Sequence, residues 1–311
     1  MYKTFLGLRA NPFDMNPDPR YLFMTRHTEE ALACLVYGVE SRKGFVLLTG
    51  EVGTGKTTLV NKLLDRLREQ SIAAAFVFNP RMNVQQFLNY IVTDFGITNE
   101  SPSRVKRDKD EVLRDLNYWL LDRYRSGQTA VLIVDEAQNV SEEVLEEIRL
   151  LTNLETSTEK LLQVVLVGQP ELEYKLKQPS LRQLRQRITL WAKTQPLSCE
   201  ETEAYVAERL RIAGSNGESI FESSALLAIH RFSGGIPRIV NLICEHCLVA
   251  AFADHKKQIS KDVVEVVARD FDLNDASSSS GLTSDVVGVT PASKSELVEA
   301  LKTVSSWDEL R

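Results

Sequence analysis

The segment 50–57, GEVGTGKT, combines three glycines with a lysine and a hydroxyl residue at the spacing of a phosphate-binding loop. In such a loop, backbone N–H groups cradle phosphates, the lysine contacts the outer phosphates and the hydroxyl group coordinates Mg²⁺. An apolar run at 45–48 precedes the loop and a helical pattern follows it, so bound phosphates would also face a helix N-terminus. We therefore predict a nucleotide site, with Lys56 on the terminal phosphates and Thr57 on Mg²⁺. The residues predicted to bind the nucleotide are Gly50, Glu51, Val52, Gly53, Thr54, Gly55, Lys56, Thr57 and Thr58.

Two adjacent acids end a second apolar run, TAVLIVDEAQ at 129–138. Asp135 is predicted to hold Mg²⁺, and Glu136 to orient or deprotonate a water that attacks the γ-phosphate. A glutamate in this place favours hydrolysis over phosphate transfer to a substrate hydroxyl. The alternative is a pair of acids that merely ends a strand near a turn.

Gln169 ends the next apolar run, LLQVVLVGQ, and should emerge at the same edge of a parallel sheet. There it could hydrogen-bond the attacking water or the γ-phosphate. A simple turn glutamine before Pro170 is the other interpretation.

Arginines cluster at 180–193, SLRQLRQRITLWAK, which contains Arg182, Arg185 and Arg187. Most arginine clusters are solvated faces. A hydrolytic phosphate-loop protein nevertheless needs extra positive charge in the transition state, often from another subunit. Arg187 is the leading candidate for this catalytic arginine finger.

A last candidate, Arg238, ends the segment GGIPR at 234–238, which begins a helix with Pro237 suited to the first turn. Arg238 could contact the nucleotide and report the γ-phosphate to a lid domain. It could also be an ordinary arginine at a helix start.

Apolar strand patterns alternate with amphipathic helical patterns up to about residue 197, which predicts a mostly parallel sheet covered on both faces. Four helical patterns without strands follow, the first opened by a capping box at Ser198–Glu201. The predicted organisation is an N-terminal segment and first helix (1–44), an α/β domain (45–197), a helical lid (198–273), a Ser-rich linker (274–293) and a short C-terminal helix (294–311).

The net charge of −6 consists of interspersed charges, so no overall basic field favours nucleic acid or an anionic membrane. The longest apolar stretches have strand length, and the N-terminus has no signal-peptide pattern. We predict a cytoplasmic protein without a transmembrane segment.

The pair Cys244 and Cys247 is interpreted as small buried helix residues rather than as a metal or redox site.

Together these motifs resemble the AAA+ ATPases. The segments LGLRANPF (6–13), PDPRYLF (17–23) and HTEEALACLVYG (27–38) resemble, more narrowly, the ExeA/GspA-type ATPases of bacterial secretion and envelope export. The resemblance implies an AAA+ fold with a five-stranded, mostly parallel sheet and an all-helical lid. It also implies ATP and Mg²⁺ as ligands, ATP hydrolysis, a homo-oligomer with ATP at the subunit interface, and a partner in a secretion, pilus or exopolysaccharide export machinery, through which the protein would lie at the inner membrane.

The resemblance assigns a role to each candidate residue. Gln169 would be the first sensor, Arg238 the second sensor and Arg187 the finger, with Arg185 as a fallback. Residues 11–21 would lie near the adenine. Two features depart from the pattern: the first sensor is a glutamine, and a Ser-rich segment stands where longer members carry a membrane helix and a peptidoglycan-binding domain.

Two other functions stay open at this point. A DNA-associated ATPase of the transposition-helper or initiator type would use the basic stretches SRVKRDKD (103–110) and LRQLRQR (181–187). A module that binds nucleotide without cleaving it is disfavoured by the presence of Lys56, Asp135 and Glu136.

Overall fold

The computed structural model describes residues 2–78, 81–97, 108–217 and 219–273. Their contacts divide into two compact units. We call residues 2–25, 52–58 and 195–273 the helical unit, and residues 26–51 and 59–194 the sheet unit. The predicted helix at 294–311 and the linker before it lie outside the described residues.

The sheet unit is built on five parallel strands in the order β2-β3-β4-β1-β5. Their bounds are β1 (Phe45–Thr49), β2 (Ala73–Val77), β3 (Ala130–Val134), β4 (Leu162–Gly168) and β5 (Leu190–Lys193). The register pairs Thr49 with Gly168 and with Lys193, so the strands end at a common edge. The predicted α/β architecture, with a five-stranded parallel sheet, is confirmed.

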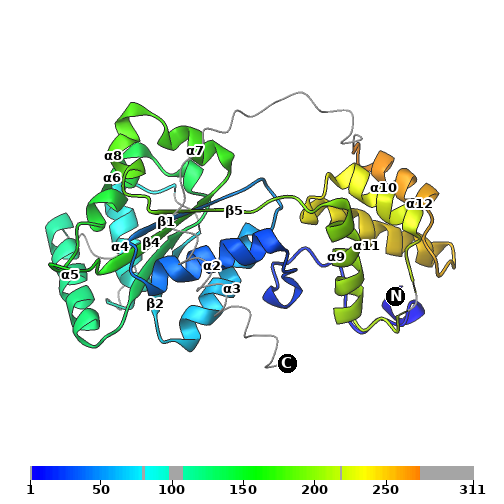
Figure 1. Cartoon of the computed structure of the whole chain (residues 1–311), viewed down its shortest axis with the longest axis horizontal. Coiled ribbons are helices and arrows are strands. Elements are labelled where there is room, and N and C mark those ends of the chain that lie inside the picture. The colour runs from blue at the N-terminus through cyan, green and yellow to red at the C-terminus, as the bar shows by residue number, and fades with distance from the viewer. Residues whose placement is uncertain (1, 79–80, 98–107, 218, 274–311) are drawn as a thin grey trace. The chain divides into compact units, whose positions relative to one another are not determined.

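Helices cover both faces of this sheet (Figure 1). They are α2 (Arg26–Glu40), α3 (Lys56–Glu69), α4 (Val84–Asp94), α5 (Lys109–Arg125), α6 (Glu142–Leu151), α7 (Pro170–Leu176) and α8 (Arg182–Arg185). Alternate strand residues such as Leu47 and Leu132 join α4, α5 and α6 in one core. The residues between them, such as Val46 and Ile133, are also buried, which is why these strands read as continuous apolar runs.

Gly38 allows α2 to approach the sheet closely. A Cβ atom at this position would lie 2.3 Å from Val46 Cγ2 and 3.1 Å from Leu190 Cδ1. Those two residues sit in register on β1 and β5. The missing side chain therefore sets how near this helix lies to the strand that leads into the phosphate-loop segment.

The helical unit contains α1 (Tyr2–Phe5), α9 (Cys199–Ile212), α10 (Ser223–Ser233), α11 (Pro237–Ala253) and α12 (Lys261–Asp270). The predicted capping box opens α9: Ser198 Oγ accepts from the Glu201 N–H at 3.1 Å, and Glu201 Oε2 accepts from the Ser198 N–H at 2.8 Å. Gly234 ends α10 with a left-handed φ of 57°. The helical character predicted for residues 198–273 thus follows from local stop and start signals.

The two cysteines of α11 pack inside the helical unit. Cys244 and Cys247 are free thiols with no exposed surface. Burial raises the pKa of Cys247 to about 12, so this thiol stays protonated at neutral pH. The two residues are small and buried in the helix, as the sequence predicted.

Residues 2–25 pack on the helices of this unit, chiefly around Arg209. Arg209 is 6% exposed, and its guanidinium donates to the carbonyls of Pro12 and Asp14, the latter at 3.3 Å. It also lies 4.5 Å from the centre of the Tyr21 ring. Of the predicted first segment, 1–44, residues 2–25 belong to the helical unit and residues 26–44 to the sheet unit. The other domain limits stay predictions.

Candidate active site

The carboxyl ends of three neighbouring strands bring the predicted acids and Gln169 to one edge of the sheet. Asp135 follows β3, Gln169 follows β4, and the phosphate-loop segment begins at Gly50, directly after β1. Asp135 is 7% exposed, and its N–H continues the ladder by donating to the Val77 carbonyl at 3.0 Å. Its Oδ1 accepts from the Glu136 N–H at 2.8 Å, so both its backbone and its carboxylate are fixed.

Glu136 has the left-handed backbone conformation, with φ 51° and ψ 38°. This conformation costs a non-glycine residue about 1–2 kcal/mol, and such residues cluster at functional sites. Glu136 Oε2 accepts two hydrogen bonds, at 2.5 Å from Gln138 Nε2 and at 3.2 Å from Gln169 Nε2. The strained turn therefore presents a carboxylate whose position is held by two amides.

Gln138 is a member of this site that the sequence did not predict. It lies in η2 (Ala137–Asn139), the short 3-10 helix after Glu136, and its Oε1 accepts from the Gln169 N–H at 3.2 Å. Its position two residues after Glu136 was the only available signal. Spacing alone does not tell whether a side chain at that position turns toward the acid or toward solvent.

A second polar group fixes the end of β1. Thr49 Oγ1 donates to Glu173 Oε1 at 2.6 Å, and Lys193 Nζ lies 2.9 Å from the same oxygen. Burial raises the pKa of the Glu173 carboxyl, but the hydrogen bonds from Thr49 and Lys193 outweigh it and hold this pKa below its usual value. This group links the ends of β1 and β5 to α7, and it also was not predicted.

Residues 52–58 of the phosphate-loop segment belong to the helical unit. Gly53 and Gly55 have φ of 83° and 92°, which only glycine adopts readily. The side chains of Thr54 and Lys56 are buried, while Thr57 is exposed in the first turn of α3. The backbone thus has the conformation that the three-glycine pattern requires.

Arg238 meets this segment at the start of α11. The Arg238 N–H donates to the Gly53 carbonyl at 3.2 Å, which satisfies one of the free donors at a helix N-terminus. A Cβ atom on Gly53 would lie 2.7 Å from Arg238 Cβ. The structure therefore brings together two of the predicted site residues, and Gly53 has to be a glycine both for its φ and for this close approach.

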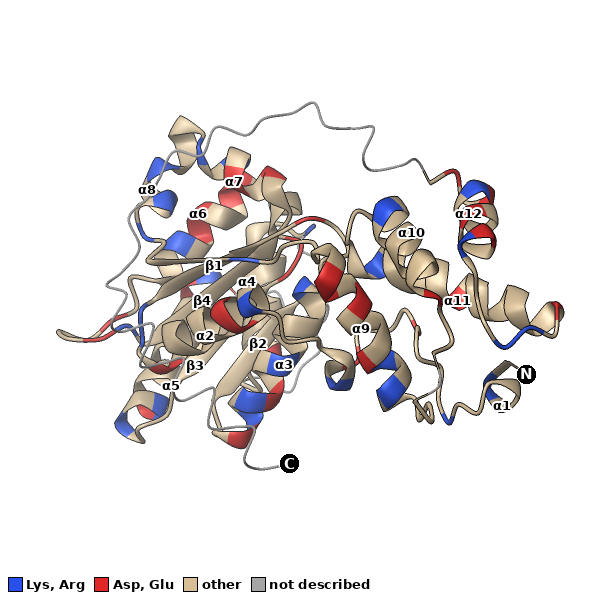
Figure 2. Cartoon of the chain, turned by 45° about the vertical axis from the view of Figure 1, so that its right-hand side comes forward, with Lys and Arg blue, Asp and Glu red and all other residues tan. Residues whose placement is uncertain are grey.

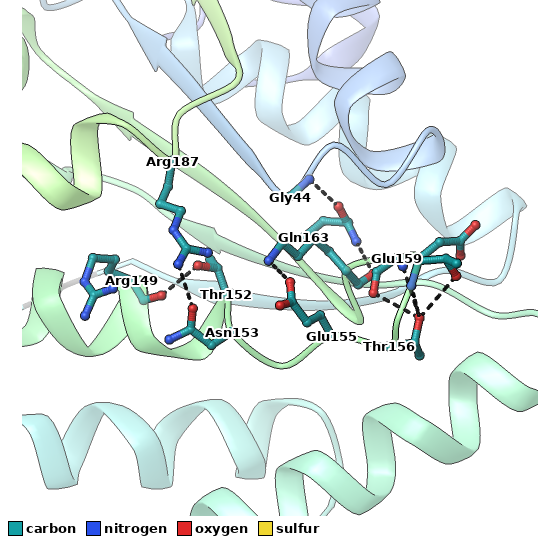
Figure 3. Close-up of polar contacts among 11 residues, drawn as sticks. Gly44, Arg149, Thr152, Asn153, Glu155, Thr156, Glu159, Gln163 and Arg187 are labelled. Carbon is teal, nitrogen blue, oxygen red and sulfur yellow. Dashed lines mark hydrogen bonds and ion pairs between the residues drawn. The ribbon is translucent and has the colours of Figure 1, made fainter.

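Arg187 lies near the amino ends of the parallel strands, whereas Glu136 lies near their carboxyl ends. It precedes β5, and its Nη2 donates to Asn153 Oδ1 at 2.9 Å (Figure 3). Glu155 is labelled in the same view. Its hydrogen bond and ion pair with Lys160 lower the pKa of its carboxyl, and the charge of Arg187 adds to the effect. The structure does not bring Arg187 to the acids of its own subunit.

The other two arginines of this segment, Arg182 and Arg185, are exposed on the short helix α8 (Figure 2). Lysines and arginines elsewhere in both units are interspersed with aspartates and glutamates. Of the basic stretch at 103–110, residues 103–107 lie outside the described part of the chain. In the view of Figure 2, the basic residues of the described ranges do not gather on one side.

The chemistry of the predicted magnesium ligands fits that metal. Asp135 and Thr57 offer a carboxylate and a hydroxyl oxygen, and Mg²⁺ is usually bound by one or two such protein ligands together with phosphate oxygens and water. A cage of several acidic side chains is not needed for this mode, and the described residues contain none.

Comparison with known proteins shows which family this chain belongs to. Residues 39–176 match the family model described as AAA domain. The chain carries an AAA domain. General secretion pathway protein A of Aeromonas hydrophila is 46% identical over 268 residues, which are 86% of this chain and 48% of that protein. The resemblance to the GspA-type ATPases is confirmed, and this chain spans about half the length of that relative.

Solved structures share the fold of this AAA domain protein at low identity. The ORC2 protein of Aeropyrum pernix, solved as ADPNP-ADP complexes, has a TM-score of 0.62 at 20% identity and covers 84% of this chain and 71% of its own. Cdc6p of Pyrobaculum aerophilum has a TM-score of 0.61 at 18% identity, with coverages of 80% and 68%. The RuvB Holliday junction branch migration motor of Thermotoga maritima has a TM-score of 0.52 at 18% identity, with coverages of 81% and 71%. At these identities the likeness concerns the fold alone.

None of the helices in the described ranges is long and apolar enough to cross a membrane.

Proposed function

We propose that this protein is an ATPase that hydrolyses ATP to drive conformational change or assembly in a bacterial secretion, pilus or exopolysaccharide export system. The observation that carries the proposal is the pair at the end of β3: Asp135 is buried and fixed, and Glu136 is held in a strained turn by two amides. A site that only holds a nucleotide has no need of a positioned second carboxylate. The family match and the GspA relative support an ATPase in this role.

In this proposal, residues 50–58 bind the phosphates of ATP through their backbone N–H groups, and the Lys56 ammonium balances the outer phosphates. Thr57 and Asp135 hold Mg²⁺, which when bound neutralises charge that develops on the phosphates. Arg238 binds the γ-phosphate. Because its backbone N–H is hydrogen-bonded to the Gly53 carbonyl, a conformational change in the phosphate loop displaces the start of α11.

Hydrolysis needs a water placed in line with the bond that breaks. Glu136 orients this water and accepts its proton. Gln169, at the end of the neighbouring strand, donates a hydrogen bond to the water or to the γ-phosphate. Glu136 Oε1 has no hydrogen-bond partner in the described part of the chain, whereas Oε2 has two. The free oxygen is the one that we assign to the water.

Arg187 completes the site of a neighbouring subunit. Its position at the far edge of the sheet supports action in trans, as does its exposed hydrogen bond to Asn153, which a neighbour's phosphate can replace. ATP then binds at a subunit interface and stabilises a homo-oligomer, and hydrolysis loosens it. Arg185 and Arg182 are the alternative fingers.

The proposed partner is a protein of the export machinery, because the matching relative is a secretion pathway protein. A location in the cytoplasm, at the inner membrane through this partner, stays a prediction. A DNA-associated ATPase is not favoured, since the net charge is acidic and the basic residues seen in Figure 2 are interspersed with acidic ones.

The decisive test measures phosphate release from ATP and nucleotide affinity for the wild type and for Glu136→Gln. We expect the substitution to lower kcat by at least about a hundredfold while ATP affinity is retained, because only the group that activates water is lost. Glu171→Gln is a suitable control, because this exposed glutamate lies on the neighbouring helix α7. A wild type that binds ATP and releases no phosphate would show a binding module instead.

A further inference from the structure

Among the described residues, Gln138 is the side chain that bonds to both Glu136 and Gln169, the two residues predicted at the catalytic edge. Its Nε2 donates to Glu136 Oε2 at 2.5 Å, and its Oε1 accepts from the backbone N–H of Gln169 at 3.2 Å. Gln169 in turn donates from Nε2 to the same carboxylate oxygen at 3.2 Å. The three residues thus close a ring of hydrogen bonds between the ends of β3 and β4.

The turn that carries Gln138 is itself fixed from several sides. Ala137 and Val140 on either side of it are fully buried in the core of the sheet unit. The Lys175 ammonium, from α7, donates to the carbonyls of Gln138 and Val140. Burial lowers the pKa of this lysine, yet both bonds need only its N–H groups. The backbone of the turn therefore cannot shift without breaking these contacts.

Gly168 makes room for the amide of Gln138. A Cβ atom at the end of β4 would lie 2.9 Å from Gln138 Oε1 and 2.7 Å from Leu172 Cδ2. The φ of Gly168 is not left-handed, so the glycine is required here by space rather than by backbone conformation. This independent feature of β4 shows that the side-chain position of Gln138 is built into the fold.

The chemistry of the ring allows only one orientation of the amide. A carboxylate accepts hydrogen bonds and a backbone N–H donates, so the NH₂ group of Gln138 must face Glu136 and its oxygen must face Gln169. A glutamate at this position keeps the acceptor but places a second negative charge against Glu136. An apolar residue loses both bonds.

We propose that Gln138 is a positioning residue for Glu136. It holds Oε2 so that Oε1 faces the attacking water, and it ties this carboxylate to Gln169, so that the two residues move together when ATP binds. This inference rests on the proposed ATP hydrolysis. It assigns to Gln138 no contact with ATP, because its polar atoms are used within the ring.

The experiment compares Gln138→Leu and Gln138→Glu with the wild type in steady-state ATP hydrolysis, together with ATP affinity and thermal unfolding. We expect kcat to fall about tenfold for Gln138→Leu and about a hundredfold for Gln138→Glu, with KM within about twofold, because a misplaced general base affects the transition state and not ground-state binding. Gln178→Glu, an exposed glutamine in the same unit, should match the wild type.

A double-mutant cycle separates positioning from a general structural effect. In the background of Glu136→Gln, single-turnover hydrolysis should show no further loss on adding Gln138→Leu, since no carboxylate remains to be positioned. An equal further loss in that background, or unchanged kcat in both Gln138 variants, would overturn the inference while wild-type hydrolysis still supports the proposed function. Absence of hydrolysis in the wild type overturns both.

Discussion

Subunits that carry Arg187→Ala and subunits that carry Glu136→Gln should each be inactive alone and active when mixed. The reason lies in the sheet unit, where the two residues belong to opposite edges. Strand β5 runs from Leu190 to Lys193, which is an advance of about 10 Å at roughly 3.3 Å per residue. Arg187 stands three residues before that strand, and an extended arginine side chain reaches only about 7 Å. The Glu136 of the same subunit is therefore beyond its reach.

The expected activity of the mixture follows from counting interfaces. A site works when one subunit supplies Glu136 and its neighbour supplies Arg187. In an equimolar random mixture of the two variants, about one quarter of the head-to-tail interfaces meet this condition. Arg187→Ala alone should lose about 10³-fold in kcat or more, because an arginine finger contributes 10³–10⁵. Glu136→Gln alone should lose at least about a hundredfold, because the group that activates water is missing. The mixture should thus recover about a quarter of wild-type turnover.

The assay is steady-state phosphate release at a protein concentration where the wild type is oligomeric by light scattering. Arg125→Ala, at an exposed arginine on α5, should leave turnover unchanged in the same experiment. Turnover in the mixture equal to the mean of the two parents would refute action in trans. Full activity of Arg187→Ala with loss in Arg185→Ala would move the finger to Arg185.

Three further predictions concern the framework around the site. Arg209→Lys should lower the free energy of unfolding in urea by about 2–4 kcal/mol, since the buried carbonyl of Pro12 loses its guanidinium donor and the bond to the Asp14 carbonyl is lost as well. Gly38→Ala should destabilise by about 1–3 kcal/mol, because its Cβ would lie 2.3 Å from Val46 Cγ2. Glu173→Gln should remove part of the acid-induced loss of stability: the folded pKa of Glu173 is below its ordinary 4.5, so its stabilisation is present above that pH and lost as the pH falls.

The first two predictions have a variant for comparison, and the third has a result that would contradict it. Arg211→Lys, at an exposed arginine of the same helix, should cost less than about 0.5 kcal/mol. Adding Val46→Ala to Gly38→Ala should cost less than the sum of the single changes if the clash is real. An acid unfolding curve that is identical for the wild type and Glu173→Gln would contradict the assignment of that carboxylate.

The elements that carry the predicted motifs were readable because their signals are local. Strand β3 is an uninterrupted buried run that ends on Asp135, and the glycines of 50–57 record backbone conformations that other residues avoid. Strand β5 was harder to predict from the sequence, because LWAK is short, is the outermost strand of the sheet and is only partly buried. A run of this kind has no periodicity that separates it from a loop.

The sequence by itself determined the phosphate-loop segment, the acidic pair, the alternating α/β pattern and the helical character of residues 198–273, because each depends on neighbours a few residues apart. Only the tertiary structure decided that Gln138 closes a ring with Glu136 and Gln169, that Arg187 faces away from them, and that Arg209 holds the N-terminal segment. Gln169 lies 31 residues beyond Gln138, and Pro12 lies 197 residues before Arg209. Such pairs meet because parallel strands end at one edge and helices pack in one core, which no short stretch of sequence encodes.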